Sequence, residues 1–484
     1  MLKEINYPKF QVPGRGSQRS AQIAVEMLFL AALIVILTSG FVSLAASFLQ
    51  LSVRGQNQLQ AFAIAEAGID YYRWHLSYAT QDYTDGTGGH AGPYVHPYYD
   101  GNGNAIGQFS LTITPPPIGS TIVTVQSAGT VFADPSIQKV IRAQFGIASF
   151  AQFAWVLNDD VYFGSTAQVF GVIYTNAGVH FDGTAHNLVE SALTTYTDPD
   201  NSKNEWAVYT DGPPADPQPP TALSPNATVF QAGRALGVPA VDFAGITADL
   251  ASIKSQAQAS GTYFGSSTVF GYDLALATTS YTVYKVTALM SAPGGCTNAL
   301  NQTGWGTWTV KTESQFATGT IPQSGSMFFE DNLWVRGHIN GVRVAVASGR
   351  FPANPATYSN IMITTSTVYG NFNGSDTLAL ISQNNITVGL QSDNNLTVDA
   401  ALMAQNGWVG RYYYSSNCGS AWQRNSLTTL GIMGSNLRSA FAYGDGSGFN
   451  TRTYNFDSNL LYAPPPNFPL TTNQYSLLSW KELQ

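Results

Sequence analysis

Apolar and polar residues along the chain mark out a membrane-length helix near the N-terminus. From Met27 to Val53 no charged residue occurs. As a helix rising 1.5 Å per residue, this stretch spans about 40 Å, more than the roughly 30 Å of a bilayer core. Because basic residues precede it, the pattern predicts a membrane-spanning helix whose N-terminus is cytoplasmic. These basic residues are Lys3, Lys9, Arg15 and Arg19.

Helical periodicity continues beyond the apolar stretch. In residues 57–76, "NQLQAFAIAEAGIDYYRWHL", the apolar residues Leu59, Phe62, Ile69 and Leu76 are spaced by three and seven. This spacing predicts an amphipathic extension of the helix. A cleaved secretory signal is the alternative, but its apolar core is shorter and ends in a small-residue cleavage site. The length therefore favours a basic leader over residues 1–21 and a retained helix over 22–76.

The next region predicts a small antiparallel sheet. Residues 77–106 are rich in Gly, Pro, Asp and Asn and predict a loop. Apolar and polar residues then alternate in "GQFSLTIT" (107–114), "STIVTVQSAGTVF" (120–132) and "QKVIRAQFGI" (138–147). Such alternation is typical of strands with one buried face. We therefore expect a loop and an antiparallel meander over residues 77–148.

The remainder predicts a β-rich head in two parts. Short β-runs separated by Gly and Asn turns fill residues 149–210 and return over 326–484. This texture favours a β-solenoid, with a sandwich as the alternative. "NNITV" (384–388) and "NNLTV" (394–398) predict equivalent positions on successive rungs. The Pro-broken C-terminal end is expected to wrap against a sheet.

Residues 211–325 interrupt the β-texture and predict a mixed insertion. It begins with the Pro-rich "TDGPPADPQPPTALSPN" and continues into one helix, followed by further strands. The helix is predicted from helical spacing and a terminal Gly261. The spaced residues are Phe243, Ile246, Leu250 and Ile253. The predicted fold is α+β, mainly β.

The composition favours an extracytoplasmic surface protein. Only 10% of residues are charged, and the formal net charge is −8. The missing charge is replaced by Thr, Ser, Asn, Gln, Gly and Tyr, which build β-structure with uncharged polar faces. Because no basic stripe or aromatic platform is present, we do not expect a nucleic-acid partner.

Two cysteines, Cys296 and Cys418, lie far apart without the spacing of a zinc site. In an exported protein they form either one disulfide or two separate buried thiols. The sequence leaves that choice open.

Two polar segments resemble metal-ligand sets only weakly. "HFDGTAH" places His180, Asp182 and His186 close in sequence. "DPDNSKN" offers oxygen ligands at alternate positions but lacks the central glycine and the distal glutamate of an EF-hand. Those ligands would be Asp198, Asp200, Ser202 and Asn204. The loop after Asp100 fails likewise, since Leu111 occupies the distal position. Polar turns are the favoured interpretation, and we expect no metal and no cofactor.

An enzyme is the main alternative class, because β-solenoids host polysaccharide lyases and glycosidases. Such enzymes need paired carboxylates or a base beside an acidic cluster. The second head part contains few acids and no specific pairing, and neither a G-x-S-x-G elbow nor a phosphate-binding glycine loop occurs. The acids are Glu330, Asp331, Asp376, Asp393 and Asp399, and the nearby bases are Arg336, Arg343 and Arg350. We expect a protein without enzymatic activity.

The N-terminal segment resembles type IV pilins and pseudopilins. "SAQIAVEM" (20–27) resembles their processing site, in which a small residue precedes the cut and a glutamate is the fifth residue of the mature chain. The resemblance places the cut between Ala21 and Gln22 and makes Glu26 that glutamate; the family's usual residue at Ala21 is glycine. "LQAFAIAEAGID" resembles the PilX-type minor pilins, in which an Ala-Glu-Ala segment, here Ala65, Glu66 and Ala67, ends the long helix.

The resemblance covers about the first 75 residues and implies assembly as the function. It implies that a prepilin peptidase removes the leader and that Glu26 pairs with the N-terminal amine of a neighbouring pilin or pseudopilin subunit. It further implies anchoring in the cytoplasmic membrane, with the head displayed outside for priming or for adhesion to surface glycans or a partner cell. A membrane-anchored surface protein outside any filament is the other interpretation.

Overall fold

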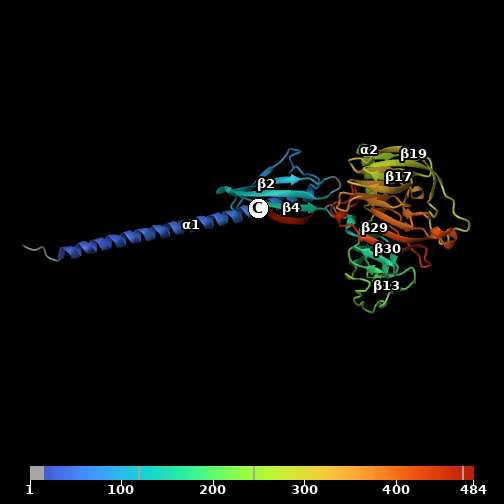
Figure 1. The fold of residues 1–484 in the computed structure, drawn as a ribbon, viewed down its shortest axis with the longest axis horizontal. Helices are drawn as coiled ribbons and strands as arrows, with labels where there is room; N and C mark the ends of the chain where they lie inside the picture. The colour runs from blue at the N-terminus through green and yellow to red at the C-terminus, as the bar shows by residue number, and fades with distance from the viewer. Residues whose placement is uncertain (1–15, 118–119, 148, 244–245, 471–473, 484) are drawn as a thin grey trace, which may run out of the picture.

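A single long helix projects from two β-rich units (Figure 1). The computed structural model describes residues 16–117, 120–147, 149–243, 246–470 and 474–483. Helix α1 spans Gly16–Tyr78, 63 residues. From Gln22 to Arg54 every residue is exposed, and the helix is long and apolar enough to cross a membrane. The outer half of α1 therefore packs against no other part of the described chain.

The inner half of α1 packs on the sheet through small residues. Its buried face carries Ala61, Ile64, Ala65, Ile69, Tyr72 and Leu76. A Cβ atom on Gly129 would lie 2.2 Å from the Ala61 carbonyl oxygen, so glycine permits this close approach. Leu59, predicted on the buried face, is 74% exposed. That prediction was wrong because the close packing selects small side chains rather than the largest apolar ones.

A five-stranded antiparallel sheet, here called the small sheet, receives the helix. Its strand order is β1-β2-β3-β4-β31, and the predicted antiparallel meander corresponds to β2, β3 and β4. Strand β1 lies within the predicted loop, which is a correction. Pro97 is tolerated there because β1 is an edge strand. The strands are β1 (Tyr94–Tyr99), β2 (Ala105–Thr114), β3 (Val123–Val131), β4 (Asp134–Gly146) and β31 (Ser476–Leu483).

The end of the chain returns to the small sheet. Strand β31 pairs antiparallel with β4, and the C-terminus lies beside the helix entry (Figure 1). Lys139 and Glu482 join the two strands by an ion pair with a 2.5 Å N–O distance. The head, residues 149–470, is thus inserted between the fourth and fifth strands of this sheet.

Parallel ladders of short strands build the head. The first ladder contains ten strands in the spatial order β16-β20-β22-β25-β27-β29-β5-β8-β11-β15. Their bounds are β16 (Thr262–Phe264), β20 (Ser326–Phe329), β22 (Arg343–Ser348), β25 (Thr377–Ser382), β27 (Asn395–Ala404), β29 (Gln423–Ser435), β5 (Trp155–Leu157), β8 (Ile173–Thr175), β11 (Val189–Ser191) and β15 (Arg234–Leu236).

The second ladder runs alongside the first in the order β17-β21-β24-β27-β29-β30-β7-β10. Its further strands are β17 (Tyr272–Thr278), β21 (Leu333–Ile339), β24 (Thr367–Tyr369), β30 (Gly448–Phe456), β7 (Ala167–Phe170) and β10 (Thr184–Ala185).

The third ladder consists of two separate pieces, β21-β23-β26-β28 and β6-β9-β14. Its further strands are β23 (Ile361–Met362), β26 (Ile386–Val388), β28 (Val409–Arg411), β6 (Val161–Phe163), β9 (Val179–Phe181) and β14 (Val208–Tyr209). Within the described residues no strand pairing joins β28 to β6. Apolar side chains from the ladders form one continuous core.

The chain enters this stack in the middle. It runs from β5 outward to β15, crosses to the opposite end at β16, and returns strand by strand to β29 and β30 (Figure 1). There β29 pairs with β5 and β30 pairs with β7. The two head parts, distant in sequence, therefore meet at a seam.

Asparagine side chains stack along the ladders, but not where the repeat predicted. The Asn384 amide donates to Asn360, and the Asn360 amide donates to Asn332, at separations of 24 and 28 residues. Asn425 instead donates to Asn395. "NNITV" and "NNLTV" thus lie on different ladders, and their equivalence was wrong because ten residues are too few for one step of the stack.

The remaining elements flank the stack. Helix α2 (Ile246–Ser260) buries Leu250, Ile253 and Ala257 beside β20, as its apolar spacing predicted. The Trp-rich segment before Val310, predicted as strand, is irregular. The other strands are β12 (Thr195–Thr197), β13 (Asn204–Trp206), β18 (Ser280–Leu289) and β19 (Val310–Thr320), and five 3-10 turns span Phe150–Gln152, Pro355–Thr357, Ser416–Cys418, Ser420–Trp422 and Ser458–Leu460.

Candidate functional site

The outer half of α1 presents one carboxylate on an exposed apolar surface. Glu26 is exposed, as are its neighbours Val25 (65%) and Met27 (65%). The Gln22 amide lies one helical turn earlier, with its Nε2 atom 3.5 Å from the Glu26 carboxylate. Residues 1–15 of the predicted leader lie outside the described residues, and the predicted cut after Ala21 falls within α1. A cut there would place the new amine one turn from Glu26.

The Ala65–Ala67 segment lies where α1 contacts the small sheet. Ala65 is buried against the sheet, Glu66 is exposed, and Ala67 is half-buried. The helix does not end here, as the resemblance implied, but continues to Tyr78. Tyr72 and Leu76 remain buried in the sheet interface, which explains why the helix continues.

A large cavity opens at the seam of the head. Its volume is about 1360 Å³, and it lies where the third ladder is interrupted between β28 and β6. Aromatic side chains and uncharged polar groups make up much of the wall. The lining includes Trp155, Tyr162, Gln302, Asn384, Asn385, Trp408, Ser439 and Tyr443. The break in one ladder, with the other two continuous, leaves room for this cavity.

Several buried polar atoms facing the cavity lack hydrogen bonds. Trp155 is 1% exposed, yet its indole nitrogen has no hydrogen-bond partner among the described residues, and the Ser439 hydroxyl also has none. A buried donor without a partner costs about 1 to 3 kcal/mol. Such groups in a cavity wall are available to a ligand that supplies the missing partner.

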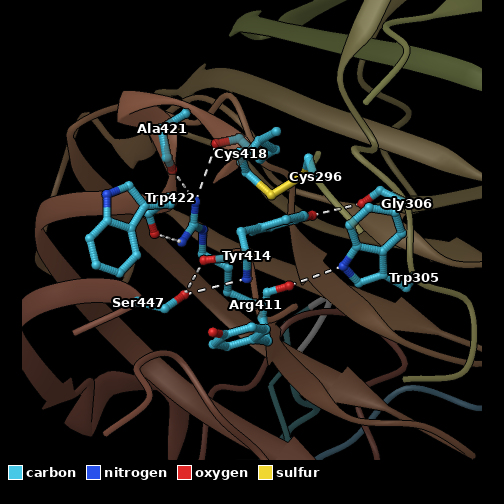
Figure 2. The surroundings of a disulfide bond; sticks show 11 residues. Cys296, Trp305, Gly306, Arg411, Tyr414, Cys418, Ala421, Trp422 and Ser447 are labelled. Carbon is cyan, nitrogen blue, oxygen red and sulfur yellow. Dashed lines mark hydrogen bonds between the residues drawn. A yellow bond between two sulfur atoms is a disulfide. The ribbon is translucent and has the colours of Figure 1, made fainter. Parts of the chain in front are cut away.

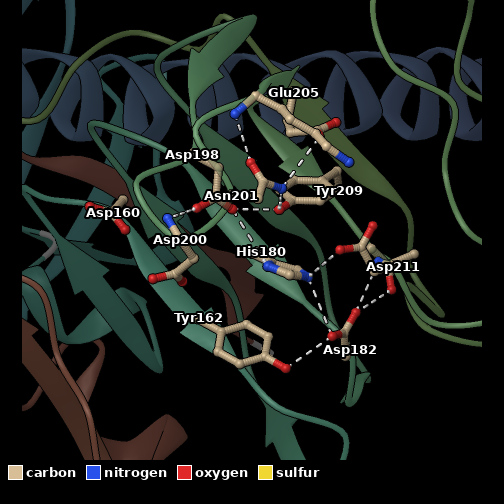
Figure 3. A network of polar contacts seen from close by, with 12 residues as sticks. Asp160, Tyr162, His180, Asp182, Asp198, Asp200, Asn201, Glu205, Tyr209 and Asp211 are labelled. Carbon is tan, nitrogen blue, oxygen red and sulfur yellow. Dashed lines mark hydrogen bonds and ion pairs between the residues drawn. The ribbon is translucent and has the colours of Figure 1, made fainter. Parts of the chain in front are cut away.

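At one edge of the cavity, His180 lies among four carboxylates (Figure 3). We call His180, Asp182, Asp198, Asp200 and Asp211 the His180 cluster. The His180 Nε2 atom lies 3.3 Å from Asp182 and 3.6 Å from Asp211, and Nδ1 lies 3.5 Å from Asp198. His180 is 9% exposed, and neither ring nitrogen makes a hydrogen bond. The cluster thus combines a buried imidazole with an excess of negative charge.

Two tyrosines fix the cluster's geometry. The His180 ring stacks on Tyr209 with a centroid distance of 4.4 Å, and the ring of Tyr162 lies at the same distance on another side. The Tyr209 hydroxyl donates a short hydrogen bond to Asp198, and Tyr196 donates to the same oxygen at 3.1 Å. Burial, followed by the contact with Asp198, raises the pKa of Tyr209. Tyr209 therefore stays protonated and acts as a donor.

The carboxylates differ in their protonation. Burial alone would raise the pKa of Asp198, but the donors of Tyr209, Asp200 and Tyr196 outweigh it and lower that pKa. At the neighbouring Asp160, burial dominates over Arg438 and raises the pKa to about 6. Arg438 pairs with Asp160 through Nε at 3.2 Å and with Asp200 through Nη1 at 3.0 Å. Arg438 thus offsets only part of the charge.

The structure joins residues from both weak metal-ligand segments. His180 from the first segment meets Asp198 and Asp200 from the second, although 18 residues separate His180 from Asp198. His186 lies elsewhere: it stacks on Phe170 at 3.9 Å and contacts Gln231 at 2.8 Å. Ser202 and Asn204 are exposed and contribute only backbone contacts to this turn. Spacing in sequence did not reveal this grouping, because a turn and a strand pairing create it.

The disulfide corner is a second polar centre of the head (Figure 2). Cys296 and Cys418 form a disulfide, the pairing that the sequence left open. Beside it Arg411 is fully buried and donates to the carbonyl oxygens of Trp422, Leu390 and Ala421. Its guanidinium also lies 4.9 Å from the Tyr414 ring centroid. Burial lowers the pKa of Arg411 to about 10.

The acids named for an enzyme take part in separate contacts. Glu330 pairs with Lys254, and Asp331 pairs with Arg350. Asp376 accepts from the backbone of Asn371 and Gly341, and Asp393 from Ser366. Asp399 accepts from the Tyr369 backbone at 3.1 Å, and burial raises its pKa.

The two remaining bases have contacts of their own. Arg336 binds Asp273 and Glu313, and Arg343 donates to backbone carbonyl oxygens near the end of the head. Each candidate acid or base thus has a local structural partner.

Comparisons with known proteins leave the family open. No family model matches the chain, and no curated protein matches it. Among solved structures, the chain is similar to the crystal structure of the competence-associated pilin ComZ from Thermus thermophilus. The identity is 14%, with 88% of this chain and 98% of that chain covered, and the TM-score is 0.30. Because a TM-score of 0.30 is low, the function proposed below depends on the geometry of this chain.

Proposed function

We propose that this protein is a non-enzymatic minor pilin or pseudopilin of the PilX type, a subunit of a type IV pilus or of a secretion-related filament. The observation that carries the proposal is the outer half of α1. It is membrane-length, exposed and apolar, and Glu26 is its single carboxylate between Gln22 and Val53. A carboxylate in lipid costs about 2.5 to 3.5 kcal/mol near the helix centre and less at the edge. A neighbouring subunit's N-terminal amine would offset much of that cost.

The assembly mechanism follows from this arrangement. The basic leader keeps the N-terminus cytoplasmic until a prepilin peptidase cuts between Ala21 and Gln22. The apolar helix then leaves the cytoplasmic membrane and packs with the same helices of other subunits. Glu26 of one subunit pairs with the Gln22 amine of the next and sets their axial register.

The head is the displayed part, and we treat its ladders as turns of a β-solenoid. Parallel pairing at steps of 24 to 31 residues supports that interpretation. Aromatic rings and neutral amides in the cavity wall suit a neutral surface glycan, since rings stack on sugar faces while amides bind hydroxyl groups. Adhesion to glycans on a surface or partner cell is therefore the proposed role of the head.

Processing and assembly are tested together. The full chain is co-expressed with a prepilin peptidase and with the major subunit of a filament system, and the mature N-terminus is sequenced. We expect Gln22 as the first residue and the protein in the sheared filament fraction. An uncut Met1 would contradict the proposal and favour a membrane-anchored surface protein outside any filament.

The role of Glu26 is tested by substitution with a matched control. Glu26→Ala should still be cut but should be lost from filaments by at least tenfold, because the unpaired amine remains in the apolar core. Glu66→Ala removes an exposed carboxylate from the inner half of the same helix and should assemble like the wild type. Normal assembly of Glu26→Ala would refute the register role.

A further inference from the structure

From the His180 cluster we infer a binding site for a first-row divalent transition-metal cation, with Zn²⁺ as the simplest case. The ligands are His180, Asp198 and Asp200. One ligand atom from each lies within 4.8 Å of the others. This inference is independent of filament assembly, since it concerns the edge of the head cavity.

The distances suit a cation after a small contraction. Zinc binds nitrogen and oxygen ligands at about 2.0 to 2.2 Å, so opposed ligand atoms lie at most about 4.4 Å apart. The 4.8 Å limit observed here exceeds that by a few tenths of an ångström. Asp198 and Asp200 lie in the turn between β12 and β13, and the Asp200 backbone N–H donates to Asp198 at 2.7 Å. The two carboxylates can therefore move with one short turn.

The His180 ring is oriented as a metal ligand requires. Its Nδ1 atom faces Asp198 at 3.5 Å, while Nε2 faces Asp182 at 3.3 Å. Metal-bound histidines usually donate their second ring N–H to a carboxylate, which fixes the tautomer and orients the ring. Asp182 is itself held in place by the Thr210 hydroxyl and by the backbone N–H groups of Asp211 and Gly212. Asp182 therefore serves as the orienting carboxylate.

The buried imidazole points to a missing partner. Both ring nitrogens are inaccessible to solvent and make no hydrogen bond among the described residues. A ligand at Nδ1 would satisfy one nitrogen, and closer approach of Asp182 would satisfy the other. The lowered pKa of Asp198 keeps this carboxylate ionised, as a metal ligand must be.

Charge and access also favour a cation. Six carboxylates gather here, and Arg438 is the cation that pairs with two of them. The six are Asp159, Asp160, Asp182, Asp198, Asp200 and Asp211. His180 and Asp200 line the cavity, which gives an ion a route from solvent and leaves positions for water or a ligand group. One nitrogen and two oxygens fit Zn²⁺, Mn²⁺ or Co²⁺ better than Ca²⁺, which prefers six to eight oxygens.

Cobalt provides a direct spectroscopic test. The full chain, purified in detergent with a tag that contains no histidine, is stripped with a chelator and titrated with Co²⁺. We expect a visible absorption band that saturates at one equivalent and is abolished by competing Zn²⁺. Absence of any band or calorimetric signal up to about 1 mM Co²⁺ or Zn²⁺ would overturn the inference, because such a site would be weaker than roughly 4 kcal/mol.

Variants separate the site from incidental surface binding. His180→Gln and Asp200→Asn should each weaken Co²⁺ binding by at least tenfold, while His186→Gln, the other histidine of the same segment, should bind like the wild type. Asp200 is 47% exposed at its side chain, so Asp200→Asn tests the site even if His180→Gln fails to fold. Binding that is unchanged in Asp200→Asn, or reduced equally in His186→Gln, would refute the assignment.

Discussion

The disulfide corner and the His180 cluster both bury a basic side chain beside aromatic rings, yet they treat it in opposite ways. Arg411 is fully buried and donates to three carbonyl oxygens. His180 is nearly as buried, but its ring nitrogens make no hydrogen bond and face carboxylates at 3.3 to 3.6 Å. Matched polarity makes the corner a structural element. Unmatched polarity at a cavity edge makes the cluster a place where a ligand can bind.

The largest expected effect is at the corner. Arg411→Met leaves three buried carbonyl oxygens without their donor and should lower the free energy of unfolding by about 3 to 5 kcal/mol. Urea denaturation of the full chain in detergent measures it. Arg424→Met is the matched control, since Arg424 also donates to the Leu390 carbonyl but is half-buried. A loss below about 1 kcal/mol for Arg411→Met would contradict a structural role for the corner.

Removing the disulfide should have the next largest effect. The bond closes a loop with a sequence separation of 122 residues, so replacing both Cys296 and Cys418 by Ser should cost about 2 to 4 kcal/mol. The melting temperature should fall by the same amount when the wild-type protein is treated with reductant. Reductant should leave the double variant unchanged. A wild-type protein insensitive to reductant would contradict this prediction.

A moderate effect is expected from the hydroxyl that holds Asp198. Tyr209→Phe removes a hydrogen bond to an ionised group, worth about 1.5 to 3 kcal/mol, and should also weaken Co²⁺ binding because Asp198 loses its orientation. Tyr162→Phe is the control, because its hydroxyl bonds Asp182 from a side chain that is partly exposed. Equal losses in both variants would show that the cluster does not depend on Asp198 in particular.

The smallest expected effect is a pH dependence. Burial raises the pKa of Asp160 to about 6, above its value in the unfolded chain. The folded state then binds the proton more readily between about pH 4 and 6, so this residue favours folding as the pH falls from 7 to 5. Asp160→Asn should lose that increment. The melting-temperature difference between wild type and variant should therefore shift by a few °C in favour of the wild type at pH 5; a shift of opposite sign would refute it.

Local patterns predicted the elements whose contacts are close in sequence. The absence of charge from Met27 to Val53 predicted the outer half of α1, and strict alternation predicted β2, β3 and β4. Helical spacing likewise predicted α2 and its buried Leu250. Each depends on a periodicity of 3.6 or 2 residues that one short segment contains in full. Strand β1 was missed because turn-forming residues surround it and Pro97 lies within it.

The cluster and the corner could not be predicted from spacing. His180 meets Asp198 through the pairing of β9 with β14 and the turn after β12. Both segments were recognised as polar, but the partner of each lay in the other. Asp160, Tyr209 and Arg438 were missed altogether, because single polar residues in β-texture carry no local signal of convergence.

The sequence by itself determined a long apolar helix with one carboxylate, an antiparallel meander and a β-rich remainder, because these depend on local periodicity and on the cost of charge in lipid. Only the tertiary structure decided that β31 closes the small sheet, that the chain enters its stack in the middle, and that Cys296 reaches Cys418. Those choices depend on strand pairings between segments more than 100 residues apart. The seam, its cavity and the His180 cluster all result from them.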